Sequence, residues 1–193
     1  MIRYNNLINR FPIKMNYRSI VTDFKSLVEL QQKSCIEHST RPLFGTNIPN
    51  TKWISYKEWN ENINHFRSVL QNLSIDHGDK VSIISNNKIE WAVSAYATYS
   101  AGGVFVPMYQ NQLEKDWKYI LQDSKAKVLI CTNKETYKRC SKFTDTIKSL
   151  NHLIYLNDNY FDLYQDIKFS DSAKFSPNFI DDKIIYPKEN DLA

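Results

Sequence analysis

The sequence has few of the residues on which phosphate-binding loops and metal sites depend. It contains only four glycines among 193 residues, and neither G-x-G-x-x-G nor G-x-x-x-x-G-K occurs. Because such loops bring backbone N–H groups to phosphate oxygens, we assign no cofactor-binding residue to this chain's own motifs. The four histidines are scattered, and H-E-x-x-H is absent. We therefore assign no metal-binding residue and no catalytic residue.

Cysteines and long apolar runs are also scarce. Cys35, Cys131 and Cys140 are an odd number without a C-x-x-C pair, which favours free thiols in a reducing compartment. No stretch approaches the roughly 20 apolar residues of a membrane-spanning helix, so any membrane contact is expected to be peripheral. The net charge of +4 is mild, and the basic residues are spread along the chain. Aromatic residues lie at core spacings instead of alternating with Lys and Arg, so we expect no nucleic-acid partner.

The composition is that of a folded protein. Hydrophobic residues make up 42% and charged residues 24% of the chain, and the length suits one domain or a piece of a larger one. Residues 1–22 carry four basic residues and no acid. Two interpretations of this segment stay open, a flexible tail and an organelle transit segment, so the expected location is the cytoplasm or an organelle. Residues 23–193 form the candidate domain.

Short apolar runs carry the clearest fold signal. Residues 81–84, 104–106 and 128–130 are rich in β-branched side chains and do not alternate between apolar and polar, which predicts strands buried on both faces. A fourth strand is expected at residues 153–156. Helical patterns separate these runs, and strands that alternate with helices predict a parallel sheet. The expected fold class is therefore α/β, a mostly parallel sheet with flanking helices.

Apolar residues three and four positions apart predict the helices. The stripes comprise Phe24, Leu27, Val28, Leu30 and Ile36; Tyr56, Trp59, Ile63, Phe66, Leu70 and Leu73; Leu113, Trp117, Ile120 and Leu121; and Tyr137, Cys140, Phe143 and Ile147. Residues 89–99 leave almost no polar face, which predicts a helix buried on most sides. Gly102 and Gly103 should end that helix, because glycine tolerates the left-handed conformation of a C-terminal cap.

Cap and turn residues set the expected boundaries of these elements. A side-chain oxygen with an acid three positions later predicts a helix start, and this spacing occurs at Ser55 with Glu58, Asn87 with Glu90, Asn111 with Glu114 and Thr132 with Glu135. Residues 40–51 contain two prolines and Gly45, which predicts a loop, and residues 53–54 are expected to form a short strand. Gly78 should allow a turn at residues 76–79. Residues 157–188 show no assignable pattern.

A parallel sheet binds ligands at the carboxyl ends of its strands. The first of these ends is followed by Ser85, Asn86, Asn87 and Lys88, with no glycine that would let a phosphate approach the backbone. Tyr109 lies just beyond the carboxyl end of the next strand. It is the one residue that we assign as a candidate substrate-binding residue.

Several short motifs resemble the N-terminal third of AMP-forming acyl-CoA synthetases. They are Trp53-Ile54-Ser55-Tyr56-Lys57-Glu58, Gly78-Asp79-Lys80-Val81, Asn87 with Glu90-Trp91, Gly102-Gly103-Val104-Phe105-Val106-Pro107-Met108-Tyr109, Tyr119-Ile120 and Asp123-Ser124-Lys125-Ala126-Lys127-Val128. The Pro107-Met108-Tyr109 run is most similar to the long- and medium-chain fatty acid ligases. The resemblance implies the incomplete N-terminal α/β domain of such an enzyme.

The resemblance also implies a two-step reaction. ATP and a fatty acid would give an acyl-adenylate and pyrophosphate, and CoA would then displace AMP. The full-length enzyme would therefore use ATP, Mg²⁺ and CoA, with a Gly/Ser/Thr-rich phosphate loop and a lysine in a mobile C-terminal domain. Residues 187–193 resemble the segment that leads into that loop, and neither the loop nor the lysine's domain is matched here.

We therefore expect a fragment of a fatty acyl-CoA synthetase that is inactive alone. Two alternatives are a short non-catalytic binding module derived from the synthetase, and a fragment of another adenylate-forming ligase, for an aryl or amino acid. Assembly into a homo-oligomer stays open.

Overall fold

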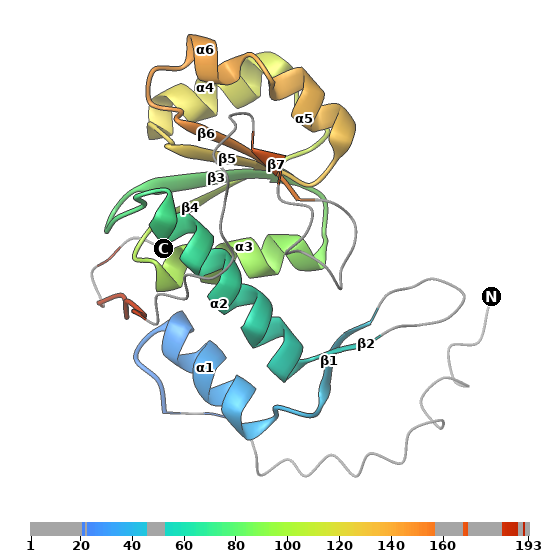
Figure 1. Ribbon diagram of the computed structural model, residues 1–193, viewed down its shortest axis with the longest axis vertical. Helices are drawn as coiled ribbons and strands as arrows, with labels where there is room; N and C mark the ends of the chain where they lie inside the picture. Colours follow the sequence, from blue (N-terminus) through green and yellow to red (C-terminus); the bar gives the residue numbers. More distant parts are fainter. Residues whose placement is uncertain are drawn as a thin grey trace, which may run out of the picture.

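A five-stranded sheet lies between two layers of helices in the computed structural model of this chain (Figure 1). The structure describes residues 21, 23–45, 53–156, 168–169, 183–188 and 191. The strands lie in the order β4 (Val104–Tyr109), β3 (Lys80–Ser85), β5 (Val128–Cys131), β6 (His152–Tyr155) and β7 (Lys168–Phe169). The first four run parallel, and β7 is antiparallel to β6. The predicted α/β class with a mostly parallel sheet is confirmed.

The two helix layers cover opposite faces of the sheet (Figure 1). The first helix layer contains α1 (Leu27–Glu37), α2 (Tyr56–Asn72) and α3 (Ile89–Ser100), and the second contains α4 (Glu114–Ser124), α5 (Lys134–Cys140) and α6 (Phe143–Thr146). Each layer shares its own buried core with one face of the sheet. Along β3, for example, Val81 and Ile83 belong to the core of the first layer and Ile84 to that of the second, as alternation along a strand requires.

Strand β4 lies at the edge of the described sheet. The expectation that residues 104–106 are buried on both faces is wrong, because Val104 and Val106 are only partly buried. Phe105 packs into the first core and Met108 into the second. An edge strand has a neighbour on one side only, so its flanks keep contact with water. Residues 128–130, in the interior strand β5, are fully buried as expected.

Helix α2 starts and packs as its sequence predicts. The N–H of Glu58 donates to Ser55 Oγ at 3.2 Å, and the N–H of Ser55 donates to the Glu58 carboxylate at 2.7 Å, so the capping box is confirmed. The buried members of its predicted stripe are Trp59, Ile63, Phe66 and Leu70, and Tyr56 and Leu73 are partly buried against the same core. The period of 3.6 residues therefore locates this face correctly.

The other three predicted caps are wrong. Helix α3 starts after Lys88 and α4 after Leu113, in both cases without a side-chain cap, so Asn87 and Asn111 lie too early to serve. Helix α5 is capped by Asn133 instead of Thr132, with Asn133 Oδ1 accepting from the N–H groups of residues 135 and 136. The helix starts are set by where the chain leaves the strands, and an Asn–Glu spacing of three does not override this.

Residues 40–51 are not simply a loop. Strand β1 (Pro42–Gly45) pairs antiparallel with β2 (Trp53–Ser55), and residues 46–52 lie outside the described part of the chain. A Cβ at Gly45 would lie 3.0 Å from the Trp53 ring, so this glycine permits close packing across the hairpin. The predicted strand at residues 53–54 is confirmed.

The first helix is shorter than predicted. Helix α1 begins at Leu27, because Ser26 Oγ accepts a hydrogen bond from the N–H of Glu29 and caps it. Val28, Gln31 and Cys35 are its buried residues, whereas Phe24, Leu27 and Ile36 of the predicted stripe are exposed. The stripe is therefore wrong in part.

Helix α3 ends as predicted at the glycine pair. The N–H of Gly103 donates to Thr98 O at 2.9 Å and that of Gly102 to Tyr99 O at 3.0 Å, and Gly102 has φ +81°. This arrangement is a Schellman cap. Gly78, at φ +82°, likewise confirms the turn before β3.

The stripes of the second layer are largely confirmed. Trp117 and Leu121 are fully buried, but Leu113 is exposed because it precedes the helix. The single helix expected after residue 132 is interrupted into α5 and α6, and its Cys140, Phe143 and Ile147 are buried. The predicted segment 1–22 lies outside the described residues except for Val21.

Candidate functional site at the carboxyl edge of the sheet

The chain changes direction within the sheet between β3 and β5. From β3 it passes through α3, in the first layer, to β4, and from β5 it passes through α5 and α6, in the second layer, to β6 (Figure 1). Adjacent strands whose connections leave in opposite directions open a crevice at their carboxyl ends, which is where open α/β sheets bind ligands. The residues that follow β3, β4 and β5 therefore define the candidate site.

A network of polar side chains joins the ends of β3 and β5. The Thr132 hydroxyl donates to Ser85 Oγ at 2.8 Å, and the Ser85 hydroxyl donates to Asn86 O at 2.7 Å. Lys88 Nζ donates to Thr132 O at 3.2 Å. Ser85 and Thr132 are buried, so these bonds are shielded from water. We call these four residues the strand-end network.

The strand-end network decides what the first crossover can bind. A phosphate cradle requires free backbone N–H groups and a cation that can reach the ligand. Here the crossover is held by side-chain bonds, and the Lys88 ammonium is already engaged with the end of β5. The one cation of this crossover thus lies against the end of β5, and the absence of a phosphate site here stays a prediction. Sequence reasoning did not find the pairing of Ser85 with Thr132, which are 47 positions apart.

Tyr109 lies at the carboxyl end of β4, directly opposite Ser85 in the strand register. Its backbone is fixed on both sides, because its N–H donates to Gln112 Oε1 and its C=O accepts from Trp117 Nε1, each at 2.9 Å. Its side chain is 78% exposed. A rigid backbone that presents an exposed ring at this edge suits a ligand contact. The structure thus gives Tyr109 the position expected from the sequence, and its contact with substrate stays a prediction.

Trp117 supports this edge from the second layer. Its ring is completely buried, and the Arg139 guanidinium lies 4.5 Å from the ring centroid. Its indole N–H reaches the Tyr109 carbonyl at the end of β4. Sequence reasoning assigned Trp117 to core packing alone. The observed bond makes it also the residue that positions Tyr109.

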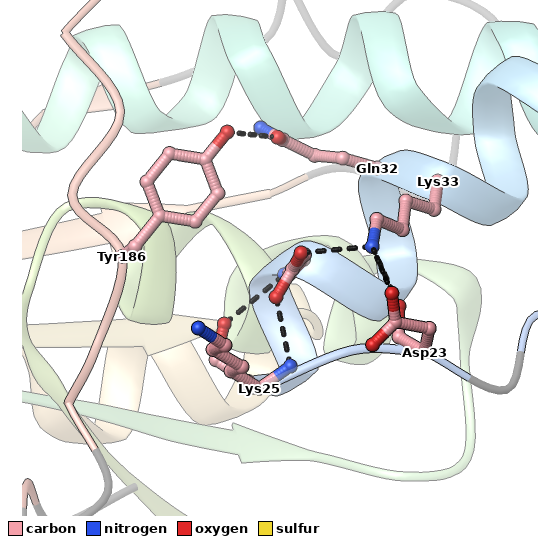
Figure 2. Close-up of polar contacts among 7 residues, drawn as sticks. Asp23, Lys25, Gln32, Lys33 and Tyr186 are labelled. Atoms are coloured by element: carbon pink, nitrogen blue, oxygen red, sulfur yellow. Dashed lines mark hydrogen bonds and ion pairs between the residues drawn. The ribbon is translucent and has the colours of Figure 1, made fainter.

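A separate cleft, of about 1160 Å³, lies between α1 and residues 186–188 (Figure 2). Its polar groups are paired with one another, because Lys33 Nζ lies 2.9 Å from the Glu29 carboxylate and the Tyr186 hydroxyl donates to Gln32 Oε1. Two hydrogen bonds lower the pKa of Glu29. The larger effect comes from the backbone N–H of Lys25 and the smaller from the Lys33 ammonium. No residue assigned from the sequence lies here, and the cleft is not at the carboxyl edge.

Residues 183–188 pack against the ends of α2 and α3. The N–H of Ile185 donates to Ser100 O at 2.9 Å, and Gln71 Nε2 donates to Lys183 O at 2.8 Å. The Ile185 side chain fills the space above Gly102, where a Cβ would lie 3.1 Å from Ile185 Cδ1. His77 Nε2 lies 3.3 Å from the Asp191 carboxylate. This segment therefore covers the amino edge of the first core.

The cysteines are buried and free. Burial raises the pKa of the Cys35 thiol to about 11, and contact with Cys140 together with burial raises the pKa of Cys131. The thiols of Cys35 and Cys131 therefore stay protonated at neutral pH and are poor nucleophiles. Within the described residues, no three His, Cys, Asp or Glu side chains gather into a metal-binding group. The described helices include none of the length and apolarity that crossing a membrane requires.

Curated proteins similar to this chain include acyl-CoA synthetases. The chain is 33% identical over 99 residues to Fatty acyl-CoA synthetase A of Dictyostelium discoideum, a match that covers 51% of this chain and 15% of that protein. It is 28% identical over 112 residues to Long chain acyl-CoA synthetase 8 of Arabidopsis thaliana, a match that covers 58% of this chain and 15% of that protein. It is also 28% identical over 106 residues to Surfactin synthase subunit 1 of Bacillus subtilis (strain 168), a match that covers 55% of this chain and 3% of that protein. The matched region thus spans about 15% of the length of the synthetases.

Solved structures share the fold at lower identity. The anthranilate CoA ligase AuaEII in complex with anthranoyl-AMP matches 72% of this chain and 26% of its own, with a TM-score of 0.63 and 18% identity. Apo MatB from Rhodopseudomonas palustris matches 74% of this chain and 26% of its own, with a TM-score of 0.57 and 23% identity. The AMP-binding enzyme family matches residues 32–193, which include the whole sheet and residues 32–37 of α1. This chain belongs to the AMP-binding enzyme family.

Proposed function

We propose that this chain supplies the N-terminal scaffold of a fatty acyl-CoA synthetase. In the proposed reaction, ATP and a fatty acid form an acyl-adenylate and pyrophosphate, and CoA then displaces AMP to give the thioester. The observation that carries the proposal is the family match over residues 32–193, together with curated relatives named as acyl-CoA synthetases in two distant organisms. The proposed substrates are thus a fatty acid, ATP and CoA.

The 193 residues alone are proposed to be inactive as a ligase. Adenylate formation requires cations and N–H donors around the phosphates, because charge must be held while the carboxylate attacks phosphorus. In the strand-end network the Lys88 ammonium is engaged with Thr132 O, and neither G-x-G-x-x-G nor G-x-x-x-x-G-K occurs in the sequence. The matched synthetases are several times longer than the matched region. ATP, Mg²⁺ and CoA would therefore bind to a longer polypeptide that contains this scaffold.

In this proposal the chain's own residues set geometry. Gly102 and Gly103 turn the chain from α3 into β4, and Trp117 fixes the backbone of Tyr109. The exposed Tyr109 ring then contacts the substrate at the carboxyl edge. Replacing Tyr109 by Ala in the active enzyme should weaken substrate use without unfolding the scaffold, because the ring makes no buried contact.

A second candidate is another adenylate-forming ligase, for an aryl or amino acid. It is favoured by the match to Surfactin synthase subunit 1, whose identity of 28% equals that of the Arabidopsis synthetase. The two matches have the same identity and therefore do not decide between their acids. The substrate class therefore has to be measured.

The test uses two preparations. One is the recombinant 193-residue chain, and the other is the native polypeptide captured from its own cells with an antibody to residues 53–131. Each is assayed for ATP–pyrophosphate exchange with long-chain fatty, medium-chain fatty, aryl and amino acids. We expect exchange with fatty acids by the native polypeptide and none by the recombinant chain. Exchange by the recombinant chain would refute the proposed inactivity, and exchange with aryl or amino acids alone would favour the second candidate.

A further inference from the structure

Folding gathers exposed positive charge on the second helix layer. Within residues 114–148, the exposed charged side chains are seven basic residues and three acids: Lys115, Lys125, Lys134, Lys138, Arg139, Lys142 and Lys148, against Asp123, Glu135 and Asp145. Over the described residues from 23 to 100, the exposed set is three basic residues and five acids: Lys25, Arg41 and Lys57, against Asp23, Glu37, Glu58, Glu61 and Asp76. Residues 183–188 pack on the first layer and add the exposed Lys183 and Lys188, so the exposed charges of the first layer balance and only the second layer is positive.

The basic side chains of the second layer point away from the sheet. Two residues along a helix turn the side chain by about 200°, so a residue two positions from a buried one faces outward. Lys134 and Lys138 flank the buried Thr136 in this way, and Lys138 also lies two positions before the buried Cys140. Lys142 follows at the same spacing of four residues, at the start of α6, and is exposed.

Helix α4 contributes to the same outer surface. Lys115 and Tyr119 each lie two positions from the buried Trp117, and both are exposed. Helices α4, α5 and α6 lie together on one side of the sheet, so the residues that face away from the sheet form one surface (Figure 1). We define the basic face as Lys115, Tyr119, Lys134, Lys138 and Lys142.

The charges of the basic face are not neutralised within the described structure. Lys118 pairs with Glu114, and Arg139 lies over the Trp117 ring, so these two cations are engaged. By contrast, the structure as described pairs none of the four lysines of the basic face with an acid. An array of unpaired lysines on a surface attracts an anionic partner.

We propose that the basic face binds an anionic lipid bilayer. Lysine ammoniums are compact point charges that suit a diffuse anionic surface, whereas recognition of individual phosphates favours the planar fork of arginine, and Arg139 is stacked on Trp117. Tyr119, one turn along α4 from Lys115, is 67% exposed, and tyrosine is the kind of side chain that settles at a membrane interface. The first layer, whose exposed charges balance, is not attracted and would face the solvent, which orients the domain on the membrane.

The proposal is independent of the ligase function and predicts a definite strength. Each lysine near an anionic membrane surface strengthens binding by about fivefold, and salt weakens the attraction over a distance of about 10 Å at 0.1 M. Removing three lysines should therefore weaken binding by about 100-fold, if their contributions add. Tyr119→Ala should cause a smaller loss that salt does not change.

The test is co-sedimentation of the full 193-residue chain with vesicles. Vesicles of phosphatidylcholine alone are compared with vesicles that contain about 30 mol% phosphatidylserine, in roughly 0.1 M salt. The test variant is Lys134→Gln/Lys138→Gln/Lys142→Gln, and the matched control is Lys25→Gln/Arg41→Gln/Lys57→Gln on the opposite layer. Circular dichroism melting of each variant establishes that it is folded.

We expect binding to the anionic vesicles only, its loss in the second-layer variant, and less than a threefold change in the control. Equal binding to both vesicle types, no binding to either, or equal losses in the two variants would overturn the proposal. A parallel titration with an RNA oligonucleotide and with heparin is included. If either polyanion binds more tightly than the anionic vesicles and loses this binding in the same variant, the proposal is also overturned, and the basic face is a polyanion site.

Discussion

The two helix layers cover one sheet but are stabilised in different ways. In the first layer a chain of aromatic rings links the hairpin, α2, α3 and β4, with centroid separations of 5.7 Å for Phe44 and Trp59, 5.1 Å for Trp59 and Tyr96, and 6.1 Å for Tyr99 and Phe105. In the second layer a single buried tryptophan, Trp117, lies between α4, the end of β4 and Arg139. The first layer thus carries a chain of ring contacts, whereas in the second layer one tryptophan joins several elements.

Helix length also differs between the layers. Helix α2 has 17 residues and a capping box, whereas in the second layer α4 has 11 residues, α5 has 7 and α6 has 4. Helices this short are unstable in isolation, so the second layer depends on packing against the sheet. We infer that a few residues decide the stability of the second layer, and that the first layer tolerates the loss of any one contact better.

The largest expected effect is that of Trp117→Ala. Removal of a fully buried tryptophan should lower the free energy of unfolding by about 3–5 kcal/mol, measured by urea denaturation. Trp117→Phe keeps a ring but loses the N–H that donates to Tyr109 O. It should lower the free energy of unfolding by about 1–3 kcal/mol. A loss below about 1 kcal/mol for the alanine variant would show that the second layer does not depend on this residue.

The glycine variants Gly102→Ala and Gly78→Ala test how residues 183–188 join the first layer. Both glycines have φ near +80°, so each alanine should cost about 1–2 kcal/mol of backbone strain. Only at Gly102 would the Cβ meet the Ile185 side chain, whereas at Gly78 no atom lies within 4 Å. Gly102→Ala should therefore destabilise by about 1 kcal/mol more. Equal losses in thermal unfolding would mean that Ile185 does not pack there.

His65 should make the first layer sensitive to acid. Burial lowers the pKa of His65 to about 4 from an ordinary 6.5. Because the unfolded chain then binds the proton more tightly, the stability is fully present above pH 6.5 and is lost as the pH falls toward 4. We expect His65→Gln to remove roughly 1–2 kcal/mol of this pH-dependent loss, measured by urea unfolding at a series of pH values. Parallel curves for the variant and the wild type would contradict the assignment.

The smallest expected effect separates a real cap from an apparent one. Ser55→Ala should cost about 1 kcal/mol, because it removes the capping box of α2, whereas Asn87→Ala should cost less than about 0.5 kcal/mol, because Asn87 does not cap α3. Bonds from Ser55 lower the pKa of Glu58 below 4.5, so the box should stabilise above that pH and weaken as the pH falls through the lowered value. Similar costs for the two alanines in thermal unfolding would place a cap at Asn87.

Most of the fold could be predicted because its signals are local. The apolar runs at residues 81–84 and 128–130 are buried strands, and the stripe of α2 is its buried face. The caps predicted at Asn87 and Asn111 are absent, because the helices start one and two residues later than the Asn–Glu spacing suggests. The spacing alone therefore does not locate a helix start. Strand β1 was missed because Pro42 and Gly45 read as a loop until their partner β2 is known.

The candidate site depends on contacts between distant parts of the sequence. The position of Tyr109 follows from the end of a predicted strand, but its fixation by Trp117 requires the packing of α4. The bond between Ser85 and Thr132 arises only when β3 and β5 become neighbours. The basic residues are spread along the chain and become a surface only when the buried residues of each helix set its orientation.

The size of the native polypeptide tests the central claim most directly. The measurement is capture from the protein's own cells with an antibody to residues 53–131, followed by mass spectrometry of the captured protein. If this chain is the scaffold of an acyl-CoA synthetase, the polypeptide is several times longer and yields peptides that continue past Ala193 into a Gly/Ser/Thr-rich phosphate loop. A polypeptide that ends at Ala193 would contradict the proposed ligase function and leave a non-catalytic binding module in its place.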